Sequence, residues 1–191
     1  MKLDRKFFAR DTRTVAKSLL GKLLVHETPE GFCIGKVVET EAYLGLNDPG
    51  AIGFRRVKNV PTALLKPAGH AFIYFTYGNH WMFNVNAKKG RLGAVLIRAL
   101  EPMAGMQLMK KRRCTNENKV LTNGPGKLTQ ALDISKKQNG ADLTSGSLYF
   151  TEGPAGKFSV VRTARIGLPP GKGDRLKLRF YIKGSTFVSK R

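Results

Sequence analysis

Residues 71–87, AFIYFTYGNHWMFNVNA, constrain the fold of this chain most strongly, because their pattern is typical of a β-hairpin. Strand-forming residues dominate both halves, and Gly78-Asn79 between them tolerates the positive φ of a tight turn. The pattern therefore places Tyr77 at the tip, and the returning half alternates apolar residues with Asn84 and Asn86. Two interpretations are open. The hairpin is either a core element whose polar groups are satisfied by neighbours, or a rigid ribbon that presents Tyr77 for insertion between stacked bases.

The charge balance bears on that choice. Lysine and arginine total 34 against 13 acidic residues, a formal net charge of +21 in 191 residues. A surplus of this size favours a polyanionic partner, with nucleic acid as the first candidate and an anionic membrane surface as the second. The hydrophobic fraction of 41% distinguishes the chain from a disordered basic tail. We expect one domain over residues 1–191 and a monomer.

The chain contains no apolar run long enough to span a membrane, and its start has no apolar signal core. We therefore expect an intracellular protein, in the cytoplasm and nucleoid or in the nucleus. Cys33 and Cys114 are expected to be reduced structural thiols. The three histidines are scattered without the spacing of metal ligands, so we expect a mechanism that uses neither a metal nor another cofactor.

A strand predicted over residues 32–43 carries a group of polar side chains. Its period of two places Glu39, Glu41 and Tyr43 on one face. One interpretation is that the carboxylates form ordinary ion pairs with arginines. The other is that one carboxylate, held in a basic groove, stays ionised and polarises a water molecule or stabilises a developing cation.

Arg98 stands out in the nearly apolar segment 94–100, AVLIRAL. A buried arginine needs an anionic partner, and Glu41 is a natural candidate. The alternative is a side chain that snorkels to solvent at a strand end. Residues 44–70 contain three prolines and four glycines and are predicted to form a long surface loop, a type of segment that is often functional.

The remaining pattern predicts an α+β fold, in which a central mixed or antiparallel sheet is flanked by short helices and carries a protruding β-hairpin. A helix is predicted over residues 11–20, a second starts at Glu101-Pro102 and ends in the cationic run 110–113, and a third follows the turn 124–127. Further strands are predicted over 22–27, 148–151, 158–168 and 176–182. In the last of these one face is expected to be buried and the other, which includes Arg179, to be cationic and exposed.

Five blocks of the chain resemble, in order, the alkyladenine DNA glycosylases, the mammalian-type 3-methyladenine DNA glycosylase family. They are KVVETEAYLG from Lys36, GHAFIYFTYGNHWMFNV from Gly69, AVLIRALEP from Ala94, NGPGKLTQAL from Asn123, and ARIG with LRFYIKGS near the end. The resemblance covers most of the chain, and five blocks in one order are far more specific than any single motif.

The resemblance implies a role for individual residues. Glu41 corresponds to the carboxylate that activates the attacking water, and Arg98 together with the main chain at Ile166 helps to hold that water. Tyr43 and Tyr74 correspond to the walls that enclose a flipped base, and Asn84 to the residue that screens its exocyclic groups. Tyr77 corresponds to the side chain that fills the gap left in the duplex, while Asn79, His80 and Lys127 belong to blocks that contact DNA.

Two positions depart from the family pattern. Ile52 stands where the family usually has a histidine that forms another side of the base pocket, so one polar selector is missing. Asn79 stands where an apolar residue commonly follows the Tyr-Gly of the hairpin, which is expected to weaken the wedge.

The resemblance and the residue patterns together imply a monofunctional glycosylase that extrudes alkylated or deaminated purines from double-stranded DNA, hydrolyses the N-glycosidic bond and leaves an abasic site. One alternative is a non-catalytic protein of the same fold that binds damaged or distorted duplex. Another is an RNA-binding module, although a hairpin wedge suits a minor groove better.

Overall fold

A computed structural model describes residues 1–51, 61–76, 78–88 and 92–190. All strand pairs in it are antiparallel, and the strand order is β3-β4-β5-β2-β1-β6, with β8 pairing with both β2 and β7. The strands are β1 (Leu23–Thr28), β2 (Gly31–Tyr43), β3 (Ala71–Thr76), β4 (His80–Asn86), β5 (Ala94–Ala104), β6 (Leu148–Thr151), β7 (Val160–Thr163) and β8 (Arg179–Ile182). The predicted α+β class is confirmed, with an antiparallel sheet.

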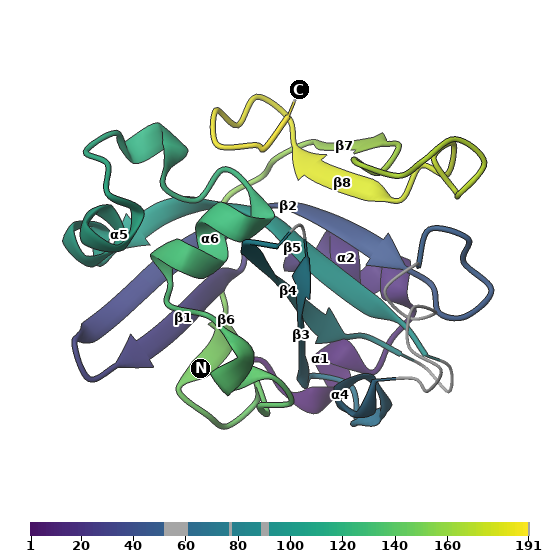
Figure 1. The fold of residues 1–191 in the computed structure, drawn as a ribbon, viewed down its shortest axis with the longest axis horizontal. Helices are drawn as coiled ribbons and strands as arrows, with labels where there is room; N and C mark the ends of the chain where they lie inside the picture. Colours follow the sequence, from purple (N-terminus) through teal and green to yellow (C-terminus); the bar gives the residue numbers. More distant parts are fainter. Residues whose placement is uncertain (52–60, 77, 89–91, 191) are drawn as a thin grey trace.

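Short helices cover both faces of this sheet. In Figure 1, α6 crosses in front of β4 and β5, whereas α2 lies behind β2 and β5. The helices are α1 (Arg5–Phe8), α2 (Thr12–Leu19), α4 (Thr62–Leu65), α5 (Met106–Arg113) and α6 (Pro125–Ala131), with the 3₁₀ turns η1 (Asn118–Val120) and η2 (Lys136–Gln138). Asp11 caps α2, the helix predicted over residues 11–20, because its carboxylate accepts from the backbone N–H groups of Arg13 and Thr14. In the part of the chain that is described, no helix is long and apolar enough to cross a membrane.

Strand β2 is the centre of the sheet. Its first half pairs with β1 and its second half with β8, while β5 runs along its other edge. The pairing of β2 with β5 skips Val38 on one strand and Arg98 on the other. Such β-bulges redirect side chains and occur often near active sites. The bulge at Arg98 allows its side chain to lie beside the acidic face of β2.

Pro102 belongs to strand β5, so the helix predicted to start at Glu101-Pro102 is wrong in its first turn. The strand continues to Ala104, and α5 begins only after Gly105, whose φ of +75° lets the chain change direction. Pro102 pairs with Gly35 where the register shifts, and a bulge of this kind tolerates a residue without an N–H group.

Of the strands predicted in the last third, 148–151 coincides with β6, whereas 158–168 and 176–182 are longer than the strands observed there. Only Val160–Thr163 of the segment 158–168 is a strand, because a turn that includes Gly167, with a φ of +78°, follows it. The prediction that Arg179 lies on an exposed cationic face is also wrong. Arg179 is 4% exposed, and this burial is possible because its Nε donates a hydrogen bond to the buried carboxylate of Glu39.

Candidate active site

The acidic face of β2 meets Arg98 of β5 inside the protein. Arg98 Nε donates to Glu39 Oε1 at 3.1 Å, and its Nη1 donates to Glu41 Oε2 at 3.3 Å. Both carboxylates are fully buried, and Arg98 is 8% exposed. The predicted contact between Glu41 and Arg98 is therefore present, and the snorkelling alternative is excluded. Burial acts to lower the pKa of Arg98, but the carboxylates of Glu41 and Glu39 outweigh it and hold that pKa above its usual value.

The carboxylate of Glu41 receives three hydrogen bonds in this structure. Ile166 N donates to Oε1 at 2.7 Å, and Oε2 accepts from the Tyr43 hydroxyl at 2.8 Å and from Arg98 Nη1 at 3.3 Å. A carboxylate offers about four acceptor sites, so the described residues leave one open, on Oε1. The bond from Arg98 is the longest of the three, and so it is the contact most easily exchanged for one to a water molecule.

Tyr43 is held between Glu41 and a second buried arginine. Burial, followed by the charge of Glu41, raises the pKa of Tyr43 well above its ordinary value, so its hydroxyl stays protonated and remains a donor. The guanidinium of Arg165 lies over the face of the Tyr43 ring, with its carbon 4.7 Å from the ring centroid. A cation over the face of a tyrosine is attracted by the ring quadrupole and fixes the orientation of the ring.

Arg165 is itself fixed by Asp48 in the loop after β2. Its Nη1 and Nη2 donate to the two oxygens of Asp48 at 2.6 and 2.7 Å, and Nη1 also donates to the carbonyl of Ala42 at 3.0 Å. Burial acts to raise the pKa of Asp48, but the hydrogen bonds and charge of Arg165 prevail and lower it. This pair was not predicted from the sequence. Its partners are 117 residues apart, and the only available signal was the arginine of the ARIG block.

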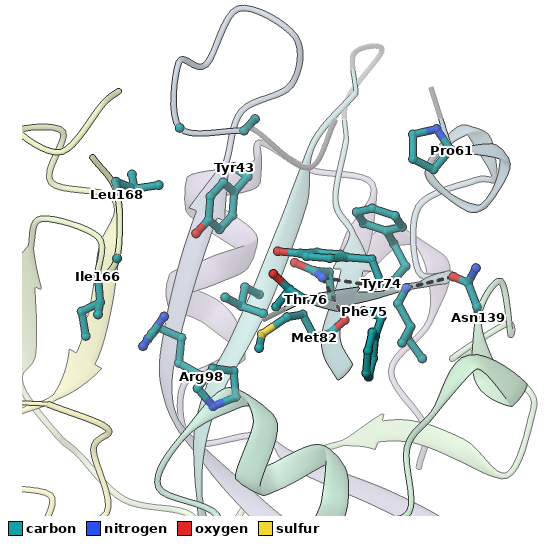
Figure 2. Close-up of a pocket in the computed structure, with 18 of the residues that line it drawn as sticks. Tyr43, Pro61, Tyr74, Phe75, Thr76, Met82, Arg98, Asn139, Ile166 and Leu168 are labelled. Carbon is teal, nitrogen blue, oxygen red and sulfur yellow. Dashed lines mark hydrogen bonds between the residues drawn. The ribbon is translucent and has the colours of Figure 1, made fainter. Parts of the chain in front are cut away.

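A cavity of about 690 Å³ lies in front of these residues, within the range of about 300–1,000 Å³ that is typical of small-molecule sites. Figure 2 shows Tyr43 and Tyr74 projecting towards it, with Arg98 at the lower left and Ile166 and Leu168 further to the left, across from Tyr74. The predicted pocket residues Tyr43, Tyr74, Asn84 and Ile166 thus line one cavity, together with Gly50, Ala51, Pro61, Phe72, Ile73, Phe75, Thr76, Met82, Leu96, Arg98, Pro125, Asn139, Gly167, Leu168 and Pro169.

Asn84 presents its amide in a fixed orientation. The side chain is 2% exposed, and its Nδ2 donates to the carbonyls of Phe72 and Met82 at 3.1 and 3.3 Å. Asn86, two residues further along β4, uses its Nδ2 to bind the carbonyls of Ala63 and Lys66. The two amides therefore serve different purposes, since Asn84 lines the cavity and Asn86 anchors the segment that contains α4.

Helix α6 supports the hairpin from the other side. The Thr129 hydroxyl donates to the carbonyl of Trp81 at 3.0 Å, and a Cβ on Gly126 would lie 2.6 Å from the His80 ring, so only glycine allows this close approach. The predicted DNA-contacting residues differ in placement. Asn79 and His80 are exposed beside the turn, whereas Lys127 is half-buried and donates to Asn123 Oδ1 at 2.9 Å. The predicted positions Ile52 and Tyr77 lie outside the described residues.

The arrangement defines a class of protein. A cavity with two tyrosine walls accepts a flat ring, and a buried carboxylate at one end, bonded by an arginine and a backbone N–H, is suited to hydrolytic chemistry. A family model described as methylpurine-DNA glycosylase matches residues 6–186 of the chain. The chain belongs to this family, and it is therefore a DNA glycosylase for alkylated bases. The family, the enzyme class and the repair function expected from the sequence are confirmed.

Relatives from three organisms carry the name "Putative 3-methyladenine DNA glycosylase". The protein of Carboxydothermus hydrogenoformans is 47% identical over the whole of both chains. That of Prosthecochloris aestuarii is 46% identical over 97% of this chain and 90% of its own, and that of Clostridium acetobutylicum is 45% identical over 99% and 98%. The similarity thus extends over the full described fold, including β8 and the segment that follows it.

Proposed function

We propose that this chain flips alkylated or deaminated purines out of double-stranded DNA, encloses them between Tyr43 and Tyr74, and hydrolyses the N-glycosidic bond to leave an abasic site. The observation that supports this most directly is the position of Glu41. Its carboxylate is buried behind the cavity wall and is bonded to Tyr43, Arg98 and Ile166, all of which line the cavity.

Extrusion of the base is a physical requirement of the reaction. The glycosidic carbon is shielded inside a stacked duplex, and a damaged, weakly paired base costs least to unstack. The cationic surplus of the chain supplies affinity for phosphates without reading sequence. Asn79, His80 and Lys127 are proposed DNA contacts, and Tyr77 is proposed to fill the gap that the flipped base leaves.

Glu41 is proposed to orient the attacking water through the free acceptor site on Oε1. As the glycosidic bond lengthens, positive charge develops on the sugar, and the Glu41 carboxylate stabilises it while accepting the proton of the water. Arg98 Nη1 exchanges its 3.3 Å bond with Glu41 for one with that water. The described cavity lining contains no lysine, which supports hydrolysis by water over attack by an amine.

Selection of the base is proposed to depend on Asn84 and on the residue at position 52. The fixed amide of Asn84 disfavours a purine whose exocyclic group clashes with it, as in ordinary guanine. Ile52 removes a polar selector that the family usually has, so shape and stacking carry more of the selection here. We further propose that the enzyme acts as a monomer, inside the cell, where its DNA substrate lies.

The test is single-turnover release of the base from duplexes that each carry one modified purine: 3-methyladenine, 7-methylguanine, hypoxanthine or ethenoadenine. The control is the same duplex with unmodified adenine or guanine. We expect release from at least one lesion and intact strands until the abasic site is cleaved by alkali. Tight binding to these duplexes with no release from any of them would instead establish a non-catalytic damage-binding protein.

A further inference from the structure

We propose that Ser189 is a positioning residue for the reaction and acts through Arg98. This inference rests on the proposed function of Glu41 and Arg98. It comes from the three nitrogens of the Arg98 guanidinium, each of which has a different partner. Nε donates to Glu39, Nη1 donates to Glu41, and Nη2 donates to the hydroxyl of Ser189 at 3.3 Å.

Glu39 and Ser189 form the fixed side of this arrangement. The Ser189 hydroxyl donates to Glu39 Oε1 at 2.9 Å, and its backbone N–H donates to Glu39 Oε2 at 2.6 Å. Arg179 Nε adds a bond to Oε1 at 2.7 Å. Glu39 thus receives four hydrogen bonds from the described residues, three on Oε1 and one on Oε2. A fully buried carboxylate held by two arginines and by Ser189 is a rigid reference point for Arg98.

The segment that carries Ser189 is held on both sides of that residue. Val188 is buried, and the carbonyl of Lys190 accepts a hydrogen bond from Arg179 Nη2. Figure 1 marks the C-terminus beside β8. The family model matches residues 6–186 and ends before this segment. Because Val188 is buried and the Lys190 carbonyl is bonded, the main chain holds Ser189 in place independently of its hydroxyl.

The Ser189 hydroxyl prevents Arg98 from binding Glu41 through two parallel hydrogen bonds. An arginine pairs most strongly with a carboxylate through two parallel N–H bonds, and such a pair would occupy the acceptor site of Glu41 that the described residues leave open. Because Nη2 is bonded to Ser189 and Nε to Glu39, Arg98 gives Glu41 a single long bond. Glu41 then keeps a site for water, and Arg98 Nη1 can turn to that water without leaving its other two partners.

The test compares Ser189→Ala with Ser189→Thr and with Ser185→Ala in single-turnover release from the best lesion duplex. Ser185 lies in the same C-terminal segment, and its hydroxyl accepts only from the Phe187 N–H among the described residues. Ser189→Ala is expected to lower the maximal rate about two- to tenfold, the factor that one hydrogen bond is worth, with less than about a twofold change in DNA dissociation constant. Ser189→Thr, which keeps the hydroxyl, is expected to restore the rate, and Ser185→Ala to leave it unchanged.

Thermal melting of each variant separates positioning from a merely structural role. A Ser189→Ala protein that melts lower but releases the base at the wild-type rate well below its melting temperature would overturn the inference. A loss that Ser189→Thr does not repair would overturn it as well. Failure of the proposed function looks different, since the wild type would then release no base, or Glu41→Gln would release it at the wild-type rate.

Discussion

Glu39 and Glu41 lie two residues apart on one face of β2, and both are fully buried, yet their surroundings differ. Glu39 receives four hydrogen bonds and contacts two arginines, Arg98 and Arg179. Glu41 receives three and contacts one arginine, and its remaining donors are a phenol and a backbone N–H. The carboxylate held between two arginines stabilises the fold, whereas the one bonded by three residues that line the cavity is suited to chemistry.

Replacing each glutamate by glutamine gives the largest contrast. Glu41→Gln is expected to reduce single-turnover base release by about 10²–10⁴-fold, the usual contribution of a general base, with retained binding to lesion duplexes. Arg98 keeps Glu39 as its counter-charge in this variant, so the protein remains folded. Near-normal release by a folded Glu41→Gln protein would remove Glu41 from its proposed role and would erase the distinction between the two carboxylates.

Glu39→Gln is expected mainly to lower the free energy of unfolding. Arg179 would lose its carboxylate and would keep two hydrogen bonds to described residues, to the Thr163 hydroxyl and the Lys190 carbonyl, and the contact of its guanidinium with the Tyr181 ring. Removing one member of a buried ion pair costs about 3–5 kcal/mol, which urea unfolding can measure. The control is Glu101→Gln, since Glu101 forms a partly exposed ion pair with Lys36 between β5 and β2, the strands that carry Arg98 and Glu39, and this pair contributes about 0–1 kcal/mol. Equal losses in the two variants would contradict a structural role for Glu39.

The part of this site that follows strand periodicity was predictable from the sequence. Alternation along residues 32–43 places Glu39, Glu41 and Tyr43 on one face, and a lone arginine in the apolar segment 94–100 requires an anion. The function came from the resemblance, because periodicity alone left both an ordinary ion pair and a catalytic carboxylate open.

The parts that depend on tertiary contacts were not predictable. Arg179 alternates with apolar residues as a solvent-facing cation would, and only the approach of β8 to β2 shows that it is buried against Glu39. The bulge at Arg98 depends on the pairing of two strands and leaves no local signal. Ser189 is an ordinary serine near the end of the chain until the fold brings it to Glu39, 150 residues away.

Tyr43→Phe sharpens the comparison by removing one of the three donors to Glu41 while keeping the ring that lines the cavity. A single hydrogen bond contributes about 0.5–1.5 kcal/mol, so base release is expected to slow by about two- to tenfold. Because the pKa of Tyr43 is raised well above its ordinary value, the phenol remains a donor throughout the neutral and mildly alkaline range. The ratio of wild-type to variant rates is therefore expected to be constant between about pH 7 and 9, where ordinary phenols are protonated too. A ratio that falls towards 1 as the pH rises through this range would show that the hydroxyl ionises there.

Asp142 provides a partly exposed carboxylate against which both buried ones can be judged. Burial acts to raise its pKa, but hydrogen bonds from Thr144 and the hydrogen bond and charge of Arg5 lower that pKa to about 2. A carboxyl group whose pKa is lower in the folded state than in the unfolded state stabilises the fold above the unfolded pKa of about 3.9, and this contribution is lost as the pH falls towards 2. Asp142→Asn is therefore expected to be less stable than the wild type at pH 7, by on the order of 1 kcal/mol or less because solvent screens the pair. In urea unfolding the two proteins are expected to converge between about pH 4 and 2. A difference that persists unchanged at pH 2 would assign the loss to packing or to neutral hydrogen bonds, and Asp142 would then no longer serve as a purely electrostatic reference for Glu39 and Glu41.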